Sequence, residues 1–321
     1  MLVNFDEADY SYDKLKSDAS ELSKQYDSIL QCVTIGRSHD NRDIILLKLG
    51  LGKKYMICCS GVHGRETINP IVLMRIIEYY ADLYVNHKET KQNLKHMLLN
   101  SSQHLGAEYE KMLLGACIYE LLQTFTILFI PLLNPDGYMI SLNGFDSINN
   151  PELKSKCLAM KLPHQDWKAN ARGVDINRNF PSRLWKPKNP EDYAASENET
   201  QALISVFHHY RSKGFLDFHS RGKQIYYYRK EMINRYNERQ LLIANRLIKH
   251  TNYELVPPDL EIDPGDSGGN TVHYFSEHFN KPALTIETVD EEASFPLDIA
   301  YREPTFHELR MVILEFGSLI I

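Results

Sequence analysis

The segment Tyr55-Met-Ile-Cys-Cys-Ser-Gly-Val-His-Gly-Arg-Glu66 leads from a short apolar strand through a glycine-rich corner. The next residues, Thr67–Val85, carry apolar side chains at helical spacing and a proline in the first turns, which predicts a helix. His63 and Glu66 therefore lie at a strand-to-helix junction, where two residues three apart can converge. Alone this spacing is not specific, because surface helices carry the same pair by chance.

A third residue of the same chemical kind lies far downstream, at His219 in Leu216-Asp-Phe-His-Ser220. Two imidazoles and one carboxylate are a ligand set for one Zn²⁺ ion with an open fourth position. Water in such a position has its pKa lowered from about 15.7 to roughly 7 and can attack a carbonyl carbon. The ligand set of His63, Glu66 and His219 is that of a hydrolase.

Three other segments carry polar groups that need an explanation. Asn134-Pro-Asp-Gly137 follows an apolar strand and is predicted to be a turn. The segment Arg172-Gly-Val-Asp-Ile-Asn-Arg-Asn-Phe-Pro181 concentrates arginines and asparagines suited to binding a carboxylate. Glu287 interrupts the apolar run Pro282–Val289, so this carboxylate needs a partner or transfers protons.

In this order, the motifs H-x-x-E, N-P-D-G, G-V-D-x-N-R-N, strand-His-Ser and strand-Glu resemble the zinc carboxypeptidase superfamily of the carboxypeptidase A type. The resemblance runs from about residue 10 to the C-terminus. Within the superfamily, the stretches Trp167–Asp175 and Tyr253–Pro258 are similar to the bacterial branch that contains γ-D-glutamyl-diaminopimelate peptidases.

The resemblance implies a role for each matching residue. The zinc ligands fall on His63, Glu66 and His219, and the general base falls on Glu287. Asp175 matches the aspartate that orients the first zinc histidine, as carboxylates commonly do at zinc sites.

The resemblance also implies how a substrate is held. Asn177 and Arg178 match the pair that binds its terminal carboxylate, and Arg65 matches a subsite arginine beside the metal. We expect Arg172 to polarise the scissile carbonyl, with Lys168 as the alternative.

Two further features of the family pattern concern the backbone and a tyrosine. A non-proline cis peptide bond is expected between Ser220 and Arg221. The position of the mobile active-site tyrosine holds Pro264, so no tyrosine can be assigned to that role.

Three other functions share part of this pattern. Gly265-Asp-Ser-Gly-Gly269 spells the nucleophile loop of trypsin-like serine proteases, but those are all-β proteins and this chain alternates strands with helices. A zinc hydrolase of N-acyl amino acids would share the ligand set, although Asn177 and Arg178 fit a carboxypeptidase better. A non-catalytic peptide-binding relative would be expected to lack a ligand or the base, and here all are present.

Composition limits the remaining possibilities. The 321 residues have a net charge of −6, and no basic stripe suggests nucleic-acid binding. Five cysteines cannot all pair, so we expect buried free thiols. No segment is typical of a signal peptide or a membrane span, which favours a cytoplasmic protein with no membrane contact. The oligomeric state is left open.

We predict one α/β domain, residues 1–321, with a central mixed, mostly parallel sheet flanked by helices and the metal ligands at the carboxyl ends of strands. A polar helical excursion is expected at Asn86–Tyr109. Asp259, Glu261, Asp263 and Asp266 form an acidic run that is expected to be a solvated edge, or to receive an amine of the substrate if its loop reaches the cleft. The expected strands are Gln31–Ile35, Ile44–Gly50, Tyr55–Ser60, Thr126–Leu133, Gly214–Phe218, Ile225–Tyr228 and Ala283–Val289, and the expected helices are Thr67–Val85, Glu108–Gln123, Glu197–Arg211, Arg235–His250 and Glu303–Phe316.

The expected activity is hydrolysis of the C-terminal peptide bond of short peptides. The favoured substrate is the murein stem peptide, cut between γ-D-glutamate and diaminopimelate. The alternative is a general metallocarboxypeptidase acting on ordinary peptides.

Overall fold

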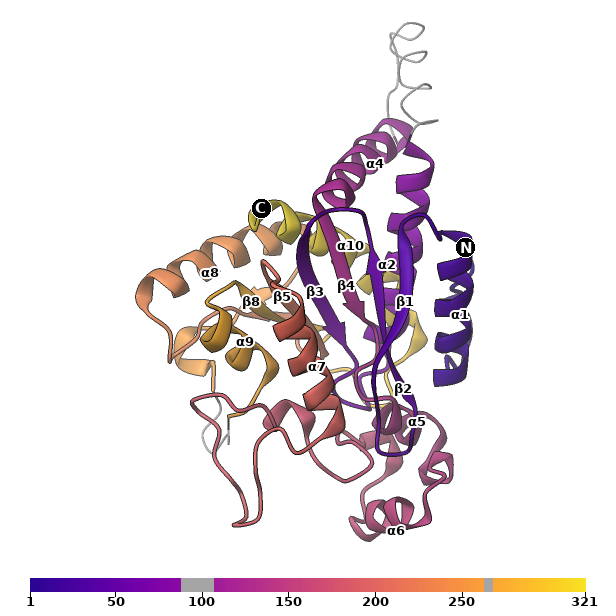
Figure 1. The fold of residues 1–321 in the computed structure, drawn as a ribbon, viewed down its shortest axis with the longest axis vertical. Coiled ribbons are helices and arrows are strands. Elements are labelled where there is room, and N and C mark those ends of the chain that lie inside the picture. Colours follow the sequence, from indigo (N-terminus) through magenta and orange to yellow (C-terminus); the bar gives the residue numbers. More distant parts are fainter. Residues whose placement is uncertain (88–106, 263–267) are drawn as a thin grey trace, which may run out of the picture.

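An eight-stranded sheet runs through the molecule in the order β1-β2-β4-β3-β5-β8-β6-β7 (Figure 1). The computed structural model describes residues 1–87, 107–262 and 268–321. The strands are β1 Leu30–Arg37, β2 Asp43–Leu49, β3 Lys54–Ser60, β4 Phe125–Ile130, β5 Phe215–Ser220, β6 Gln224–Tyr226, β7 Glu254–Leu255 and β8 Ala283–Thr288.

The four central strands, β4, β3, β5 and β8, are parallel to one another. Strands with both faces covered read as near-continuous apolar runs, and β5 is buried along its whole length. Towards the edges, β1 and β2 are antiparallel to their neighbours, and β6 is antiparallel to β8. The sheet is therefore mixed, with a parallel centre, as the sequence predicts.

Helices cover both faces of the sheet (Figure 1). One face packs against α1, α2, α4, α8 and α10, and the other against α7 and α9. The helices are α1 Tyr12–Gln25, α2 Ile68–Val85, α4 Ala107–Thr124, α5 Pro135–Asn143, α6 Pro151–Ala159, α7 Asn198–His209, α8 Asn234–Leu247, α9 Thr271–Phe279 and α10 Arg302–Leu319. Among the residues that the structure describes, no helix is both long and apolar enough to cross a membrane.

The turn predicted at Asn134–Gly137 is the start of helix α5, so that prediction was wrong. The Asn134 side chain accepts a hydrogen bond from the Gly137 amide at 2.9 Å, and Pro135 occupies the first turn. An asparagine N-cap followed by proline uses the same residue types as a turn, because both satisfy free backbone amides. The sequence prediction also missed α1, α6, α9 and the short strand β7.

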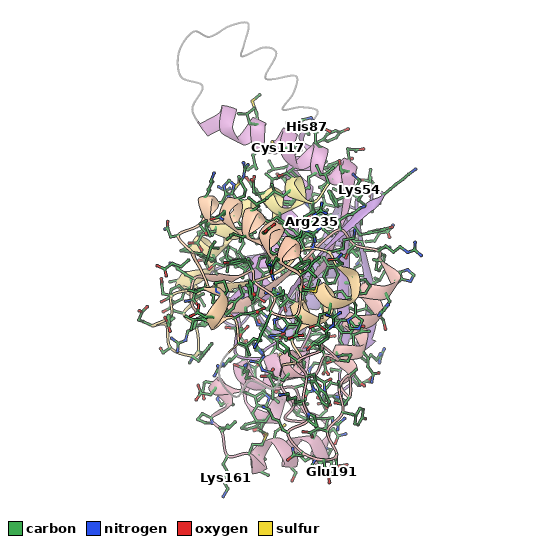
Figure 2. The ribbon with its side chains drawn as sticks, turned by 90° about the vertical axis from the view of Figure 1, so that its left-hand side faces the viewer. Lys54, His87, Cys117, Lys161, Glu191 and Arg235 are labelled. Atoms are coloured by element: carbon green, nitrogen blue, oxygen red, sulfur yellow. The ribbon has the colours of Figure 1, made fainter. Side chains whose placement is uncertain are left out.

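A lobe of α5, α6 and loops lies at one end of the molecule, where Figure 2 labels Lys161 and Glu191, opposite the end that carries His87 and Cys117. Its small apolar core is built around Trp167, which is fully buried. This core anchors the following segment beside the carboxyl ends of the central strands. Residues 88–106 of the predicted polar excursion lie outside the described residues.

Candidate active site

His63 and Glu66 lie in the corner between β3 and α2, and His219 is the penultimate residue of β5. The corner passes very close to the start of α5, since a Cβ on Gly64 would lie 2.2 Å from the carbonyl oxygen of Gly137. Only glycine fits there without moving backbone. The close approach fixes where His63 and Glu66 point.

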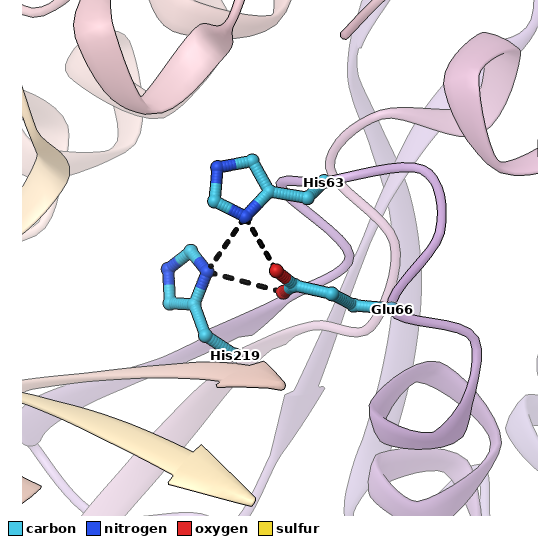
Figure 3. A group of neighbouring side chains, drawn as sticks. All are labelled: His63, Glu66 and His219. Carbon is cyan, nitrogen blue, oxygen red and sulfur yellow. Dashed lines mark hydrogen bonds and ion pairs between the residues drawn. The ribbon is translucent and has the colours of Figure 1, made fainter. Parts of the chain in front are cut away.

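The three side chains converge on one point (Figure 3). His63 Nδ1 lies 2.6 Å from Glu66 Oε1, and His219 Nδ1 lies 3.2 Å from both His63 Nδ1 and Glu66 Oε2. All three residues are buried, and one donor atom from each lies within 4.8 Å of the others. The donor set of two imidazole nitrogens and one carboxylate fits Zn²⁺.

The other nitrogen of each imidazole faces a carboxylate. His63 Nε2 lies 3.2 Å from Asp175 Oδ1, and His219 Nε2 lies 3.0 Å from Asp217 Oδ2. Such partners hold each ring so that Nδ1 faces the centre and make the ligand more basic. The sequence analysis named Asp175 but gave Asp217 no role, although a residue two before His219 on a strand shares its face.

The charges in this cluster depend on one another. Burial opposes ionisation of Glu66, but His63 and His219 lower its pKa below the usual range. Burial likewise opposes protonation of His219, but Asp217 and Glu66 raise its pKa well above the usual value. A bound cation would take the place of the imidazolium charge, because metal ligands must be deprotonated.

Glu287 lies directly beside His219 across the sheet, because the two residues are register partners in the parallel pair β5 and β8. It lines a cavity of about 210 Å³ that is also lined by His63. Burial raises the pKa of Glu287 to about 8, and Glu66 acts in the same direction, while His219 and Lys168 oppose it. A carboxylate with a raised pKa beside a hydrolytic centre is suited to general-base work.

Lys168, Asn177 and Arg178 line the same cavity. Lys168 Nζ lies 3.0 Å from Asp175 Oδ2. Asn177 Oδ1 accepts a hydrogen bond from the Thr271 amide at 3.1 Å, which fixes the orientation of its side-chain amide. Cationic and amide groups therefore line the same cavity as Glu287.

Arg172 is not brought into this cavity. It lines a neighbouring one with Arg178, and its Nη1 faces Glu197 Oε1 at 3.5 Å. The expectation that Arg172 reaches the scissile carbonyl is not met by this placement, whereas its alternative, Lys168, is in the cavity. Arg65 packs its guanidinium over the Phe295 ring at 4.4 Å and is also absent from the cavity lining.

A second group of a histidine and two carboxylates lies behind Arg172. His39 Nε2 is 3.0 Å from Glu197 Oε2 and 3.9 Å from Glu199 Oε2, and Asn170 Nδ2 donates to both carboxylates at 2.7 and 3.2 Å. Burial opposes ionisation of both carboxyls. For Glu197, hydrogen bonds from His39 and Asn170 outweigh it and lower the pKa to about 2. For Glu199, burial dominates and raises the pKa to about 7.

Other expectations concern the backbone and the 263–267 segment. The Ser220–Arg221 peptide bond is cis, so that prediction is confirmed. Pro264, Ser267 of the serine-protease-like motif, and Asp263 and Asp266 of the acidic run lie outside the described residues. Glu261, another residue of that acidic run, lines the cavity and is not solvated as expected, because only 4% of its side chain is exposed.

Together, a mixed sheet with a parallel centre and a two-histidine, one-glutamate centre at its carboxyl edge define a zinc-dependent hydrolase. The comparison with known families agrees: the chain matches the family described as Zinc carboxypeptidase over residues 15–101 and 95–309. The protein therefore belongs to the zinc carboxypeptidase family and is a metallocarboxypeptidase-type hydrolase that uses zinc and acts on peptides.

Its relatives include a bacterial peptidase, Gamma-D-glutamyl-L-diamino acid endopeptidase 1 of Lysinibacillus sphaericus. The two are 25% identical over 320 residues, which cover 94% of this chain and 72% of that protein. Among solved structures, bovine thrombin-activatable fibrinolysis inhibitor in complex with tick carboxypeptidase inhibitor superposes with a TM-score of 0.72 at 18% identity, covering 97% of this chain and 96% of that one. Carboxypeptidase A of Helicoverpa armigera superposes with a TM-score of 0.65 at 17% identity, and the match covers 98% of this chain and 75% of that one.

Proposed function

We propose that the protein hydrolyses the C-terminal peptide bond of short peptides, with murein stem peptides as the favoured substrates. The observation that carries the proposal is the shared cavity: Glu287, Lys168, Asn177, Arg178 and the metal-ligand candidate His63 all line one space. The proposed base, the cation for the carbonyl oxygen and the pair for the terminal carboxylate thus share one cavity with one of the three metal ligands.

Glu287 takes a proton from the attacking water and returns it to the leaving amine. His63, Glu66 and His219 would hold Zn²⁺, which would supply Lewis-acid polarisation and would lower the pKa of water towards neutral pH. Lys168, rather than Arg172, places its positive charge beside the oxygen that becomes negative during the attack. The ion pair of Lys168 with Asp175 holds the ammonium in the cavity.

Recognition of a free carboxylate defines the cut as C-terminal. Arg178 offers a planar guanidinium that can bind a carboxylate through two parallel hydrogen bonds. The amide group of Asn177 is oriented by the Thr271 backbone and completes the pair. A chain continuing past this point would place an uncharged amide where the carboxylate belongs, so the last residue of the peptide occupies the cavity beyond Glu287.

A murein stem peptide is favoured over an ordinary peptide on two grounds. The relative from Lysinibacillus sphaericus carries a name that describes cleavage before a diamino acid, and the similarity extends over nearly the whole chain. The wall of the cavity beyond Asn177 and Arg178 is also polar rather than apolar. A general metallocarboxypeptidase with a preference for apolar residues would be expected to line that wall with aliphatic side chains.

The mechanism is tested by separating metal binding from catalysis. His63→Ala, Glu66→Ala or His219→Ala should each lose bound zinc, because each removes one of three protein ligands. Glu287→Gln should retain zinc and lose about 10²–10⁴-fold in kcat. Glu291→Gln, an exposed glutamate just beyond the same strand, is the matched control. Near wild-type kcat in zinc-loaded Glu287→Gln would exclude Glu287 as the base.

The substrate is tested by comparing kcat/KM for L-Ala-γ-D-Glu-diaminopimelate with that for a blocked dipeptide ending in Phe or Leu. Buried polar groups that lose their partners can discriminate by about 10⁴–10⁵-fold, so the murein peptide should be strongly preferred. Comparable or faster turnover of the apolar dipeptide would rule out the murein substrate and leave a general metallocarboxypeptidase. Hydrolysis of N-acyl amino acids alone would instead indicate an acyl-amino-acid hydrolase.

A further inference from the structure

The inner wall of the cavity carries a buried ion pair. Arg229, Glu261 and His273 line it together with Tyr226, Asn270 and Thr285. Glu261 Oε1 lies 3.4 Å from Arg229 Nη1 and 2.9 Å from His273 Nε2. Only 2–4% of each of these three side chains is exposed, so the group is part of the wall.

Burying charges in a wall is costly unless each has a partner. Arg229 is held from behind, since its Nη1 donates to the Tyr228 carbonyl at 2.5 Å and its Nη2 donates to the Ala283 carbonyl at 2.8 Å. Its guanidinium is therefore fixed, and it in turn fixes the Glu261 carboxylate against the cavity. Three apolar residues would form such a wall at lower cost, so the charges point to a ligand.

Several hydrogen-bonding positions on this wall are unfilled. An ionised carboxylate has about four lone-pair positions. Glu261 uses three of them, towards Arg229, His273 and the Lys230 amide, which donates to Oε2 at 2.9 Å. His273 Nδ1 and Asn270 Oδ1 are buried and have no hydrogen-bond partner. Buried polar atoms without partners are uncommon in native proteins.

We propose that this wall selects a terminal residue whose side chain ends in an amino group, that is, a diamino acid. The ammonium donates hydrogen bonds to the remaining lone pair of Glu261 and to Asn270 Oδ1, and His273 Nδ1 is a further hydrogen-bonding position. This inference rests on the proposed function, because the carboxylate of the same residue must be held by Asn177 and Arg178. It assigns the preference to Glu261, the member of the acidic run expected to be solvated.

Specificity is measured with three peptides, L-Ala-γ-D-Glu-X, where X is diaminopimelate, lysine or norleucine. Norleucine has the chain length of lysine without the amine. In zinc-loaded wild-type protein, kcat/KM for lysine should exceed that for norleucine. Glu261→Gln should reduce this ratio by about 10- to 100-fold, the range for a hydrogen bond to a charged group. The diaminopimelate peptide shows whether a second carboxylate adds to the amine.

A binding measurement keeps the inference testable apart from turnover. By calorimetry with zinc-loaded protein, free L-lysine should bind more tightly than L-norleucine, and Glu261→Gln should abolish the difference. His273→Gln keeps a donor to Glu261, removes the Nδ1 position and is the second variant if the first folds poorly. Asp259→Asn removes an exposed carboxylate two residues away and is the matched control.

The outcomes are distinguishable. Unchanged lysine-to-norleucine ratios in both variants, with normal zinc content and Tm, would overturn the assignment while the peptidase remained established. Absence of hydrolysis with all three peptides, but tighter binding of lysine that depends on Glu261, would overturn the proposed peptide substrates and support the wall. Equal binding of the two amino acids to the wild-type protein would overturn the inference.

Discussion

Replacing Glu199 by Gln should make the protein more stable at alkaline pH but not at acidic pH. The carboxyl of Glu199 is fully buried, and its Oε1 has no hydrogen-bond partner. Burial raises its pKa from 4.5 to about 7, with His39 and Asn170 opposing the shift and Asp136 adding to it. Gln is the neutral, similarly shaped counterpart of the protonated acid and can still accept a hydrogen bond from Asn170.

The sign and size of the stability change follow from the pKa of Glu199 in the unfolded protein and its pKa in the folded protein. A raised carboxyl pKa in the folded protein gives a stabilising contribution that is complete below 4.5 and is lost as the pH rises through about 7. The difference of about 2.5 units corresponds to about 3 kcal/mol at 1.36 kcal/mol per unit. With 321 residues, and an unfolding entropy of about 2.1 cal/mol/K per residue, this corresponds to about 5 °C in Tm.

The assay is thermal unfolding of both proteins, with saturating zinc, from pH 5 to pH 8.5. The difference in Tm, Gln variant minus wild type, should rise by about 4 °C across this range, because the small part of the change that falls below pH 5 lies outside it. The pH dependence of zinc affinity is shared by both proteins and cancels in the difference. A constant difference at every pH would refute the reasoning, because it would show that Glu199 carries the same charge in the folded and unfolded states.

Three further predictions concern the active site. Asp217→Asn should fold normally and lower zinc affinity by about 10- to 100-fold, because it weakens the partner that orients His219. Competition with a chromogenic chelator measures the affinity, and an unchanged value would show that Asp217 does not orient the ring. Lys168→Met should reduce kcat by about 10²–10³-fold while Arg172→Met changes it little, and the reverse result would restore Arg172 to the carbonyl. Removal of zinc by a chelator should abolish peptidase activity and addition of zinc should restore it, whereas a serine-directed reagent should have no effect; inhibition by that reagent alone would contradict the metal centre.

The sequence predicts the parts of the site in which the functional residues lie within one short segment of regular backbone. The apolar strand, glycine corner and helix around His63 could be predicted because a strand and an amphipathic helix have different periods and glycine marks the junction. The pairing of His219 with Glu287 could be expected only as a shared sheet edge. Their adjacency depends on the order of strands, which apolar runs do not encode.

Other features depend on contacts between residues far apart in the chain. Glu261 reads as part of an acidic, solvated run, yet Arg229 pairs with it from 32 residues away and makes its burial tolerable. Arg172 is four residues from Lys168, and the sequence does not show which of them points at the centre. The structure separates them because Glu197, at the start of α7, attracts Arg172 away.

The parts of this site have separate structural origins, and this has an evolutionary consequence. His219 and Glu287, the proposed metal ligand and the proposed base, are fixed to each other by the backbone ladder of two central strands. The selective wall is built mainly from β6 and the residues that follow it, the residue after Pro258–Leu260, and the start of helix α9, and only Thr285 of this wall comes from β8. On the proposed assignment, single substitutions at Glu261 or His273 change which terminal residue is preferred and leave the metal centre in place. Related proteins that share the metal centre can therefore diverge in substrate preference.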